Sequence, residues 1–327
     1  MPCRFDPHWT YHGLECLRLE NEHVAIDVLP QLGGKVLRLV DKARDHDVLW
    51  HSPRVKPHAV ALHANFDDHW PGGWDEVFPT GVITTTRDGD VLPHMGELWT
   101  QHARWQLAEY SPQRIALHCA IDTPITPARW ERTLVLEAGS PAIRLEYRIA
   151  NTGFRGFEFN WGIHPVQAIS PGHRFDAPAH RAEVDEHGGG ILGAKGDAYD
   201  WPMFGELDVR RALGPDADDF ALHYLTGLDA GWVACTDTAA RRGFGLVFDR
   251  EVFSVIWLWL VYGGWRGYYQ AIMEPWTGYP SPLDEAVAAG RARSLAPGET
   301  LETDVTAVVY GGVTSVSRLA ADGAVQA

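Results

Sequence analysis

Apolar and polar side chains alternate over short stretches along most of the chain, which is the pattern of strands with one buried face. Val24, Ile26 and Val28 alternate in one stretch, and residues 143–149 alternate in another. Turn residues such as Asp88-Gly89 separate these stretches at intervals of about ten residues, as in antiparallel sandwiches and barrels. The pattern predicts an all-β protein with few short helices.

The stretch Phe157–Pro165 alternates as far as Trp161 and then contains Gly162 and Pro165. Proline cannot donate a hydrogen bond to the centre of a sheet, so we predict that this strand ends at or just past His164. An imidazole at a strand end is held by rigid backbone and titrates near neutral pH. We interpret His164 either as an acid/base group of a ligand site or as a histidine that only satisfies a local hydrogen bond.

Other stretches complete the predicted element map. Phe253–Leu260 and Gly267–Met273 are expected to form a pair of central strands. The one helix predicted is Pro282–Ala289, which Gly290 ends. Residues 51–80 look irregular, and Phe66–Pro79 within them is dense in aromatic, acidic and glycine residues, so we expect a long binding loop there.

The chain contains no internal repeat, linker or low-complexity block, so a single domain over residues 1–327 is the simplest organisation. Residues 314–327 lose the strand pattern, and we expect this tail to fray. Nothing in the pattern selects between a monomer and a homodimer.

Charge and cysteine usage narrow the function classes. The chain has 28 Lys and Arg against 43 Asp and Glu, a net charge of −15, which argues against nucleic acid as a partner. No apolar run is long enough to span a membrane. The first residues lack the apolar core of a signal peptide, and the four cysteines lie far apart. We therefore expect a cytoplasmic protein without disulfides.

Three polar side chains at predicted strand ends or in loops are candidates for chemistry: His94, His164 and Glu274. Glu274 follows a strongly apolar strand, where nearby apolar surface would raise its pKa and make it a base near neutral pH. The alternative is a carboxylate that caps a turn. The 14 tryptophans fill cores in most proteins, but indole rings also form platforms for the C–H faces of sugars.

Other standard chemistry is not indicated. The sequence has no nucleophile elbow and no phosphate-binding loop. Asp67, Asp68, His69 and Asp75 could bind a divalent cation, but such runs more often face solvent or bind sugar hydroxyls. We expect neither a metal nor an organic cofactor.

At this point the order of several motifs resembles the aldose 1-epimerase, or galactose mutarotase-like, superfamily. The motifs are Leu-Pro-x-Leu-Gly-Gly-Lys-Val at residues 29–36, Gly-Gly-Trp-Asp-Glu-Val-Phe-Pro at 72–79, His94 with Gly96, His164, Glu274, and Leu-Ala-Pro-Gly-Glu at 295–299. The resemblance extends from about residue 24 to residue 310. The part from the double glycine to Gly96 is similar to the hexose-6-phosphate epimerase-like branch.

The resemblance implies a large antiparallel β-supersandwich and an isomerase that interconverts the α- and β-anomers of a sugar. His164 would be the general acid that protonates the ring oxygen, and Glu274 the general base that takes the proton of the anomeric hydroxyl. His94 would hold sugar hydroxyls. The chain departs from the family pattern because Met95 separates His94 from Gly96 and because a sugar-binding aspartate has no clear match, Asp176 and Asp219 being weak candidates.

Further substrate-binding residues are expected around this pair. Trp99, Trp161 and Trp276 would supply platforms, and Asp75, Glu76 and Glu97 would bind hydroxyl groups. Lys35 and Arg266 would meet an anionic substituent, so both neutral and anionic sugars stay open as substrates.

Two rival functions stay open. One is another carbohydrate-active enzyme, an epimerase, lyase, hydrolase or isomerase with the same pocket; glycosidic cleavage would need a second carboxylate, for which Glu76 and Glu97 are the candidates. The other is a sugar-binding protein without catalysis, which would keep the tryptophans but need no acid/base pair.

Overall fold

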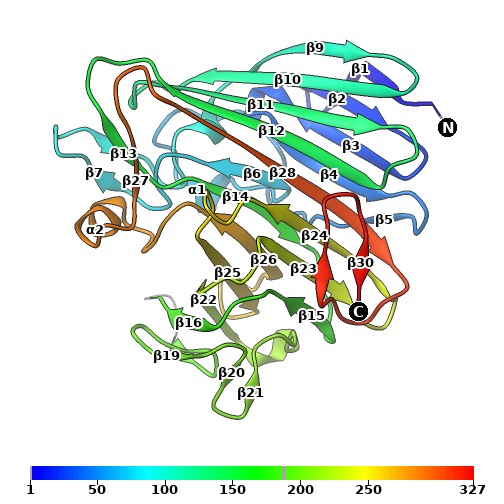
Figure 1. Ribbon diagram of the computed structural model, residues 1–327, viewed down its shortest axis with the longest axis vertical. Coiled ribbons are helices and arrows are strands. Elements are labelled where there is room, and N and C mark those ends of the chain that lie inside the picture. The colour runs from blue at the N-terminus through cyan, green and yellow to red at the C-terminus, as the bar shows by residue number, and fades with distance from the viewer. Residues whose placement is uncertain (1, 186–188) are drawn as a thin grey trace.

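Two large antiparallel sheets make up most of the protein (Figure 1). The structure is a computed structural model that describes residues 2–185 and 189–327. In these residues the larger sheet has 12 strands and the smaller sheet has eight. The all-β prediction is confirmed.

The strands of the larger sheet follow the order β1 (Arg4–Tyr11), β2 (Leu14–Glu20), β3 (Val24–Leu29), β4 (Lys35–Asp41), β6 (Trp74–Val77), β14 (Gly162–Gln167), β26 (Tyr269–Trp276), β25 (Val255–Tyr262), β22 (Asp219–Thr226), β16 (Arg181–Val184) and β19 (Ala198–Asp200), with β5 (His46–Asp47) beside β4. Those of the smaller sheet follow the order β15 (His173–Asp176), β23 (Trp232–Asp237), β24 (Arg242–Phe248), β28 (Thr300–Gly311), β12 (Ala142–Asn151), β11 (Ala128–Glu137), β10 (Arg114–Asp122) and β9 (Arg104–Tyr110).

The remaining short elements lie outside the two sheets. The two-stranded pairs are β7 (Thr84–Thr85) with β8 (Val91–Leu92), β13 (Phe157–Phe159) with β27 (Arg293–Leu295), β17 (Gly189–Gly190) with β18 (Gly193–Ala194), β20 (Met203–Phe204) with β21 (Leu207–Asp208), and β29 (Arg318–Leu319) with β30 (Val325–Gln326). The helices are α1 (Phe66–His69) and α2 (Leu283–Ala288), with single 3-10 turns at Pro30–Leu32, Leu98–Thr100 and Pro215–Ala217. No helix in residues 2–185 and 189–327 has the length and apolar character needed to cross a membrane.

The main core lies between the two sheets. It contains Ile163 and Met273 from the larger sheet together with Leu117 and Leu145 from the smaller one, all at most 2% exposed. Side chains alternate along a strand, so the neighbours of Ile163 and Met273 point to the opposite face of the larger sheet. On that opposite face, Trp257 and Trp276 belong to a separate apolar cluster. The central strands are therefore covered on both faces, which explains why β25 is apolar throughout.

Two predicted elements end elsewhere than expected. The prediction of one strand from Phe157 that ends at or just past His164 is wrong: β13 ends at Phe159, and a separate strand, β14, begins at Gly162 and runs to Gln167 through Pro165. Pro165 is paired with Trp74 of β6, whereas the pairs recorded with β26 are at Gly162, Val166 and Gln167. The second predicted central strand likewise continues past Met273, so Glu274 lies inside β26 and not after it.

Other predictions have mixed outcomes. The helix predicted at Pro282–Ala289 is confirmed as α2. The long loop expected at residues 51–80 is interrupted by α1 and by β6, a central strand. Residues 314–327, where we expected fraying, contain β29 and β30, which form a hairpin, and Leu319 is buried at 3% exposure. All four cysteines are buried free thiols.

Candidate active site

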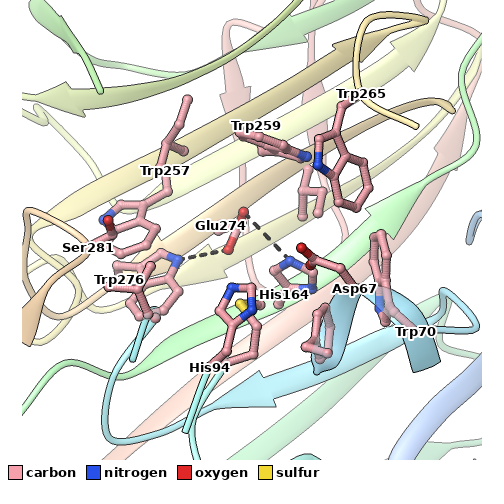
Figure 2. Close-up of a pocket in the computed structure, with 16 residues that line it drawn as sticks. Asp67, Trp70, His94, His164, Trp257, Trp259, Trp265, Glu274, Trp276 and Ser281 are labelled. Carbon is pink, nitrogen blue, oxygen red and sulfur yellow. Dashed lines mark hydrogen bonds and ion pairs between the residues drawn. The ribbon is translucent and has the colours of Figure 1, made fainter. Parts of the chain in front are cut away.

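A pocket of about 120 Å³ opens on the face of the larger sheet that points away from the smaller sheet (Figure 2). Its polar walls are formed by His94, His164, Glu274, Asp67 and Ser281. The remaining lining is mostly aromatic and apolar, and consists of Phe66, Trp70, Gly81, Val82, Met95, Leu222, Trp257, Trp259, Trp265, Ile272 and Trp276.

The register of the central strands builds the floor of this pocket. Gly162 pairs with Trp276 and Val166 with Ile272, so His164 on β14 faces Glu274 on β26. Glu274 in turn pairs with Trp257 on β25. Residues opposite each other in adjacent strands point to the same face of a sheet. His164, Glu274 and Trp257 therefore form one row of side chains across three neighbouring strands.

His164 and Glu274 are close enough to share a ligand. Nε2 of His164 lies 4.0 Å from Oε1 of Glu274, and the two side chains are only 7% and 4% exposed. This distance exceeds that of a hydrogen bond, so a third group can bind to both atoms. Nδ1 of His164 is buried and has no hydrogen-bond partner among the described residues. On the other side of Glu274, Nε1 of Trp276 donates to Oε2 at 2.8 Å.

Burial sets the proton affinities of the pair. Loss of hydration lowers the pKa of His164 to about 4, although the nearby Asp75 carboxylate acts in the opposite direction. The same loss of hydration raises the pKa of Glu274 well above its usual value, and the bond from Trp276 offsets only part of this rise. Both shifts disfavour the charged form. The pocket therefore favours an uncharged imidazole beside a protonated carboxyl group.

His94 reaches the pocket from the segment that follows β8. The extra residue Met95 adopts a left-handed backbone with φ of 59°, as does Gly96 with φ of 71°. The amide of Met95 donates to the carbonyl of Gly81 at 2.9 Å, which fixes the turn. This local kink accommodates the residue between His94 and Gly96, and the imidazole of His94 still lines the pocket.

Tryptophan rings form much of the wall. Trp257 and Trp276 stack with their ring centroids 3.7 Å apart and an interplanar angle of 10°. Gly162 makes this possible, because a Cβ atom there would lie 2.1 Å from the Trp276 ring. Trp276 was expected at the site, and the structure brings it there.

Lys35 and Asp75 were expected to bind substrate, but neither lines the pocket. Nζ of Lys35 forms an ion pair with Oδ2 of Asp75 and donates to the carbonyl of Gly72 at 2.8 Å. The indole of Trp70 donates to the same Asp75 oxygen at 3.0 Å and covers the pair. Lys35 and Asp75 are 4% and 2% exposed, so this pair lies behind His164 and supports the floor of the pocket.

Glu76 and Trp161 are also outside the pocket. Glu76 follows Asp75 in β6 and therefore points to the opposite face, between the sheets. Its carboxylate accepts hydrogen bonds from Arg132 at 3.2 Å, Tyr147 at 2.7 Å and Trp161 at 3.3 Å. Burial raises the pKa of Glu76 to about 7 despite the neighbouring Arg132 guanidinium. These contacts belong to the core and leave no group free for a sugar.

Glu97 and Trp99 lie behind the pocket wall. The carboxylate of Glu97 accepts from the backbone amides of Ile125 at 2.6 Å and Thr126 at 3.0 Å. Trp99 packs edge-on against Phe66 at a centroid distance of 5.1 Å, and its Nε1 donates to the carbonyl of His94 at 3.2 Å. Trp99 thus supports two lining residues without contacting the pocket. Neither Glu76 nor Glu97 can supply the second carboxylate that glycosidic cleavage would need.

Arg266 is at the rim of the site, in the turn between β25 and β26. Its Nη1 donates to the carbonyl of Asp67 at 2.7 Å and its Nη2 to the carboxylate of Asp68 at 3.0 Å. Arg266 was expected to bind an anionic substituent, but it instead holds α1 in place.

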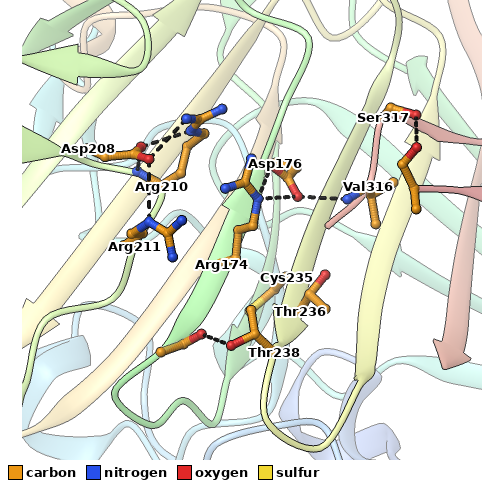
Figure 3. Close-up of polar contacts among 12 residues, drawn as sticks. Arg174, Asp176, Asp208, Arg210, Arg211, Cys235, Thr236, Thr238, Val316 and Ser317 are labelled. Carbon is orange, nitrogen blue, oxygen red and sulfur yellow. Dashed lines mark hydrogen bonds and ion pairs between the residues drawn. The ribbon is translucent and has the colours of Figure 1, made fainter. Parts of the chain in front are cut away.

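The two weak candidates for a sugar-binding aspartate, Asp176 and Asp219, have other partners. Asp176 accepts hydrogen bonds from Arg174 and from the amide of Val316 (Figure 3), and Asp219 accepts one from the amide of Leu192.

Several lining residues were not among the expected site residues, and Asp67 was considered only as part of a run that could bind a cation or sugar hydroxyls. Phe66, Asp67 and Trp70 come from α1 and the residue after it, and Trp259 and Trp265 come from β25 and its following turn. The high density of aromatic and acidic residues at 66–79 was the available signal, and it pointed to the right segment. Among the described residues, no three His, Cys, Asp or Glu side chains converge on a metal position.

Comparisons with known proteins support the fold. A family model described as a domain of unknown function (DUF5107) matches residues 9–91. A "putative aldose 1-epimerase" from Klebsiella pneumoniae has a TM-score of 0.74 and 19% identity, with 94% of this chain and 83% of that chain covered. A galactose mutarotase-like protein from Clostridium acetobutylicum has a TM-score of 0.69 and 12% identity, with 95% and 99% covered. The chain therefore has the β-sandwich fold of galactose mutarotase-like proteins, as the sequence motifs predicted.

Proposed function

We propose that the protein is an aldose 1-epimerase-type mutarotase, which interconverts the α- and β-anomers of a pyranose. The observation that carries this proposal is the pair His164 and Glu274, 4.0 Å apart in a pocket walled by indole rings. Opening a cyclic hemiacetal needs one proton delivered to the ring oxygen and one removed from the anomeric hydroxyl. The pair supplies both functions with side chains alone.

The proposed cycle balances its protons. His164 as imidazolium donates a proton to the ring oxygen O5, and Glu274 as carboxylate takes the proton of the anomeric hydroxyl O1. The C1–O5 bond breaks, and C1 becomes an aldehyde. After rotation about C1–C2, the hydroxyl on C5 attacks the other face of the aldehyde. Its proton returns to His164, and Glu274 returns a proton to O1.

Burial has a defined role in this cycle. Ring opening converts a charged imidazolium and carboxylate into a neutral imidazole and a protonated carboxyl group. The neutral forms are the ones that desolvation favours, as the lowered pKa of His164 and the raised pKa of Glu274 indicate. The environment therefore favours the neutral pair that ring opening produces over the charged pair from which the step starts. His94 would hold sugar hydroxyls, and the Trp257 and Trp276 rings would pack on C–H faces of the sugar.

The test is direct observation of anomer exchange. Freshly dissolved α-anomers of a panel of sugars are followed by polarimetry or by NMR saturation exchange, with and without protein. His164→Asn and Glu274→Gln should each lower the rate by about a hundredfold to ten-thousandfold, the usual contribution of a general acid or base. The exposed His180→Asn and Glu302→Gln, whose side chains are 67% and 71% exposed, are matched controls and should keep full activity.

Acceleration of no sugar would reject the proposal. Binding of a sugar with no acceleration of anomer exchange by the protein or by either variant would favour the non-catalytic sugar-binding protein instead.

A further inference from the structure

Asp67 brings a second carboxyl group to the pocket. It belongs to α1, far along the chain from Glu274, and its side chain is 28% exposed. Figure 2 shows this side chain turned toward the pocket, on the side of His164. Among the described lining residues, none is Lys or Arg. The charged and titratable groups that a ligand meets there are thus two carboxyl groups and two imidazoles.

Arg266 at the rim is a cation that could change this balance, but its guanidinium already has partners on α1. It donates to the carbonyl of Asp67 and to the carboxylate of Asp68, and its Nη2 is 4.0 Å from Oδ2 of Asp67. The carbonyl of Arg266 itself accepts from Arg54, whose guanidinium lies 4.3 Å from the Tyr268 ring centroid. These contacts tie α1 to the turn between β25 and β26 across the rim of the pocket.

We propose that Asp67 determines specificity by accepting hydrogen bonds from hydroxyl groups of a neutral sugar and by repelling sugars with an anionic substituent. Arg266 is the positioning residue that holds Asp67 in this place. The proposal rests on the proposed function only in taking a sugar as the ligand.

Two physical effects give this arrangement its selectivity. A carboxylate accepts hydrogen bonds from two neighbouring hydroxyl groups, and bonds to a charged acceptor are stronger than neutral ones. A phosphate or carboxylate on the sugar would instead lie near Asp67 with no cation in the wall to compensate. Like charges close together in a partly buried site repel each other.

The first experiment measures binding separately from turnover. The intrinsic tryptophan fluorescence of the whole protein is titrated with neutral hexoses and with the 6-phosphates and uronates of the same sugars. We expect the anionic sugars to bind at least about tenfold more weakly than their neutral counterparts. Asp67→Asn should raise the Kd and KM of the neutral sugar by about tenfold to a hundredfold, the usual effect of losing a charged hydrogen bond.

The same variant should leave kcat within about threefold of the unmodified protein, because Asp67 is not assigned a proton transfer. Asp67→Asn should also reduce the ratio between the Kd of the anionic sugars and the Kd of their neutral counterparts. Asp122→Asn is the matched control: Asp122 is paired with Arg104 at 2.7 Å on the smaller sheet, and its side chain is 55% exposed. This control should change neither Kd nor KM.

The positioning role is tested by coupling. Arg266→Ala should raise KM in the unmodified protein but add little in the Asp67→Asn background, since Arg266 acts through Asp67. Arg266→Lys should restore part of the affinity. If the losses of affinity from the two substitutions add, Arg266 does not act through Asp67. If Arg266→Ala unfolds and Arg266→Lys folds but regains no affinity, the role of Arg266 is purely structural. Either result would overturn the positioning role.

The outcomes separate the two proposals. Neutral sugars that bind through Asp67 without anomer exchange would support this inference and reject the mutarotase. Anomer exchange that is indifferent to Asp67→Asn, or equal binding of anionic and neutral sugars, would overturn this inference and leave the mutarotase standing. Failure of every sugar to bind would overturn both.

Discussion

His164 and Glu274 are partners across adjacent strands, with Nε2 and Oε1 4.0 Å apart. The same row of side chains extends in both directions across the sheet. Trp257 on β25 pairs with Glu274, and Asp75 on β6 pairs with His164. Four neighbouring strands thus contribute one side chain each to a single line across the sheet. A row of this kind is rigid, because each side chain is carried by a hydrogen-bonded strand with both flanks paired.

The pH dependence of activity follows from the opposite pKa shifts of the pair. The cycle needs one proton on the pair, and kcat/KM reports the free protein. At low pH activity is lost when His164 takes a second proton, near its lowered pKa of about 4. At high pH activity is lost when the pair gives up its proton, above the usual range of a carboxyl group because the pKa of Glu274 is raised.

We therefore expect a plateau that begins above about pH 4 and extends past the ordinary titration range of a carboxyl group. The measurement is kcat/KM for anomer exchange from about pH 4 to pH 9, corrected for the spontaneous reaction in each buffer. An acid limb close to the ordinary imidazole pKa would contradict the buried, neutral His164.

Trp276→Phe tests the hydrogen bond to the catalytic candidate Glu274. Phenylalanine keeps an aromatic ring beside Trp257 but removes the donor that binds Oε2 at 2.8 Å. The carboxylate form loses this bond, so the pKa of Glu274 rises further and the alkaline limb moves to higher pH. We expect kcat to fall by about tenfold or more. Trp257→Phe is the control, because Nε1 of Trp257 donates to the carbonyl of Gly278 and not to Glu274; an equal shift of its alkaline limb would refute this explanation.

Gly162→Ala tests the packing beneath the pocket. The added methyl group would lie 2.1 Å from the Trp276 ring, so the indole must move. We expect a loss of about 1–3 kcal/mol in the free energy of unfolding, typical of overpacking, together with lower activity. Gly156→Ala serves for comparison, since its nearest neighbour would be a carbonyl oxygen 3.3 Å away. Denaturant unfolding measures the stability of both variants, and near-UV circular dichroism reports the packing of their tryptophan rings. An unchanged near-UV signal in Gly162→Ala would contradict the prediction.

Lys35→Met distinguishes a supporting ion pair from a substrate contact. The substitution leaves Asp75 buried without its cation, and breaking a buried pair in this way costs about 3–5 kcal/mol of stability. If Lys35 instead bound an anionic sugar, the variant would keep its stability and lose affinity for that sugar alone. Denaturant unfolding with parallel fluorescence titrations decides between the two, and Lys42→Met, at an outer position with 27% exposure, controls for the loss of a lysine.

Sequence reasoning failed most clearly at residues 74–77. These residues were taken as part of a binding loop, and both Asp75 and Glu76 were expected at the sugar. The structure places them in a central strand, where alternation sends Asp75 to the pocket side and Glu76 between the sheets. Short strands rich in charged residues carry little alternation signal, and their ionic partners, Lys35 and Arg132, are distant along the chain.

The sequence by itself determined the all-β class, through alternation and turn spacing, and it singled out His94, His164, Glu274 and Trp276 as site residues through the order of the motifs. Only the tertiary structure decided which other polar groups reach the pocket. That choice depends on register between strands far apart in sequence, and on α1, a four-residue helix too short to leave a periodic pattern. Asp67 therefore lines the pocket, whereas Lys35, Asp75, Glu76 and Glu97 form ion pairs or hydrogen bonds with other buried groups, which no local sequence pattern reveals.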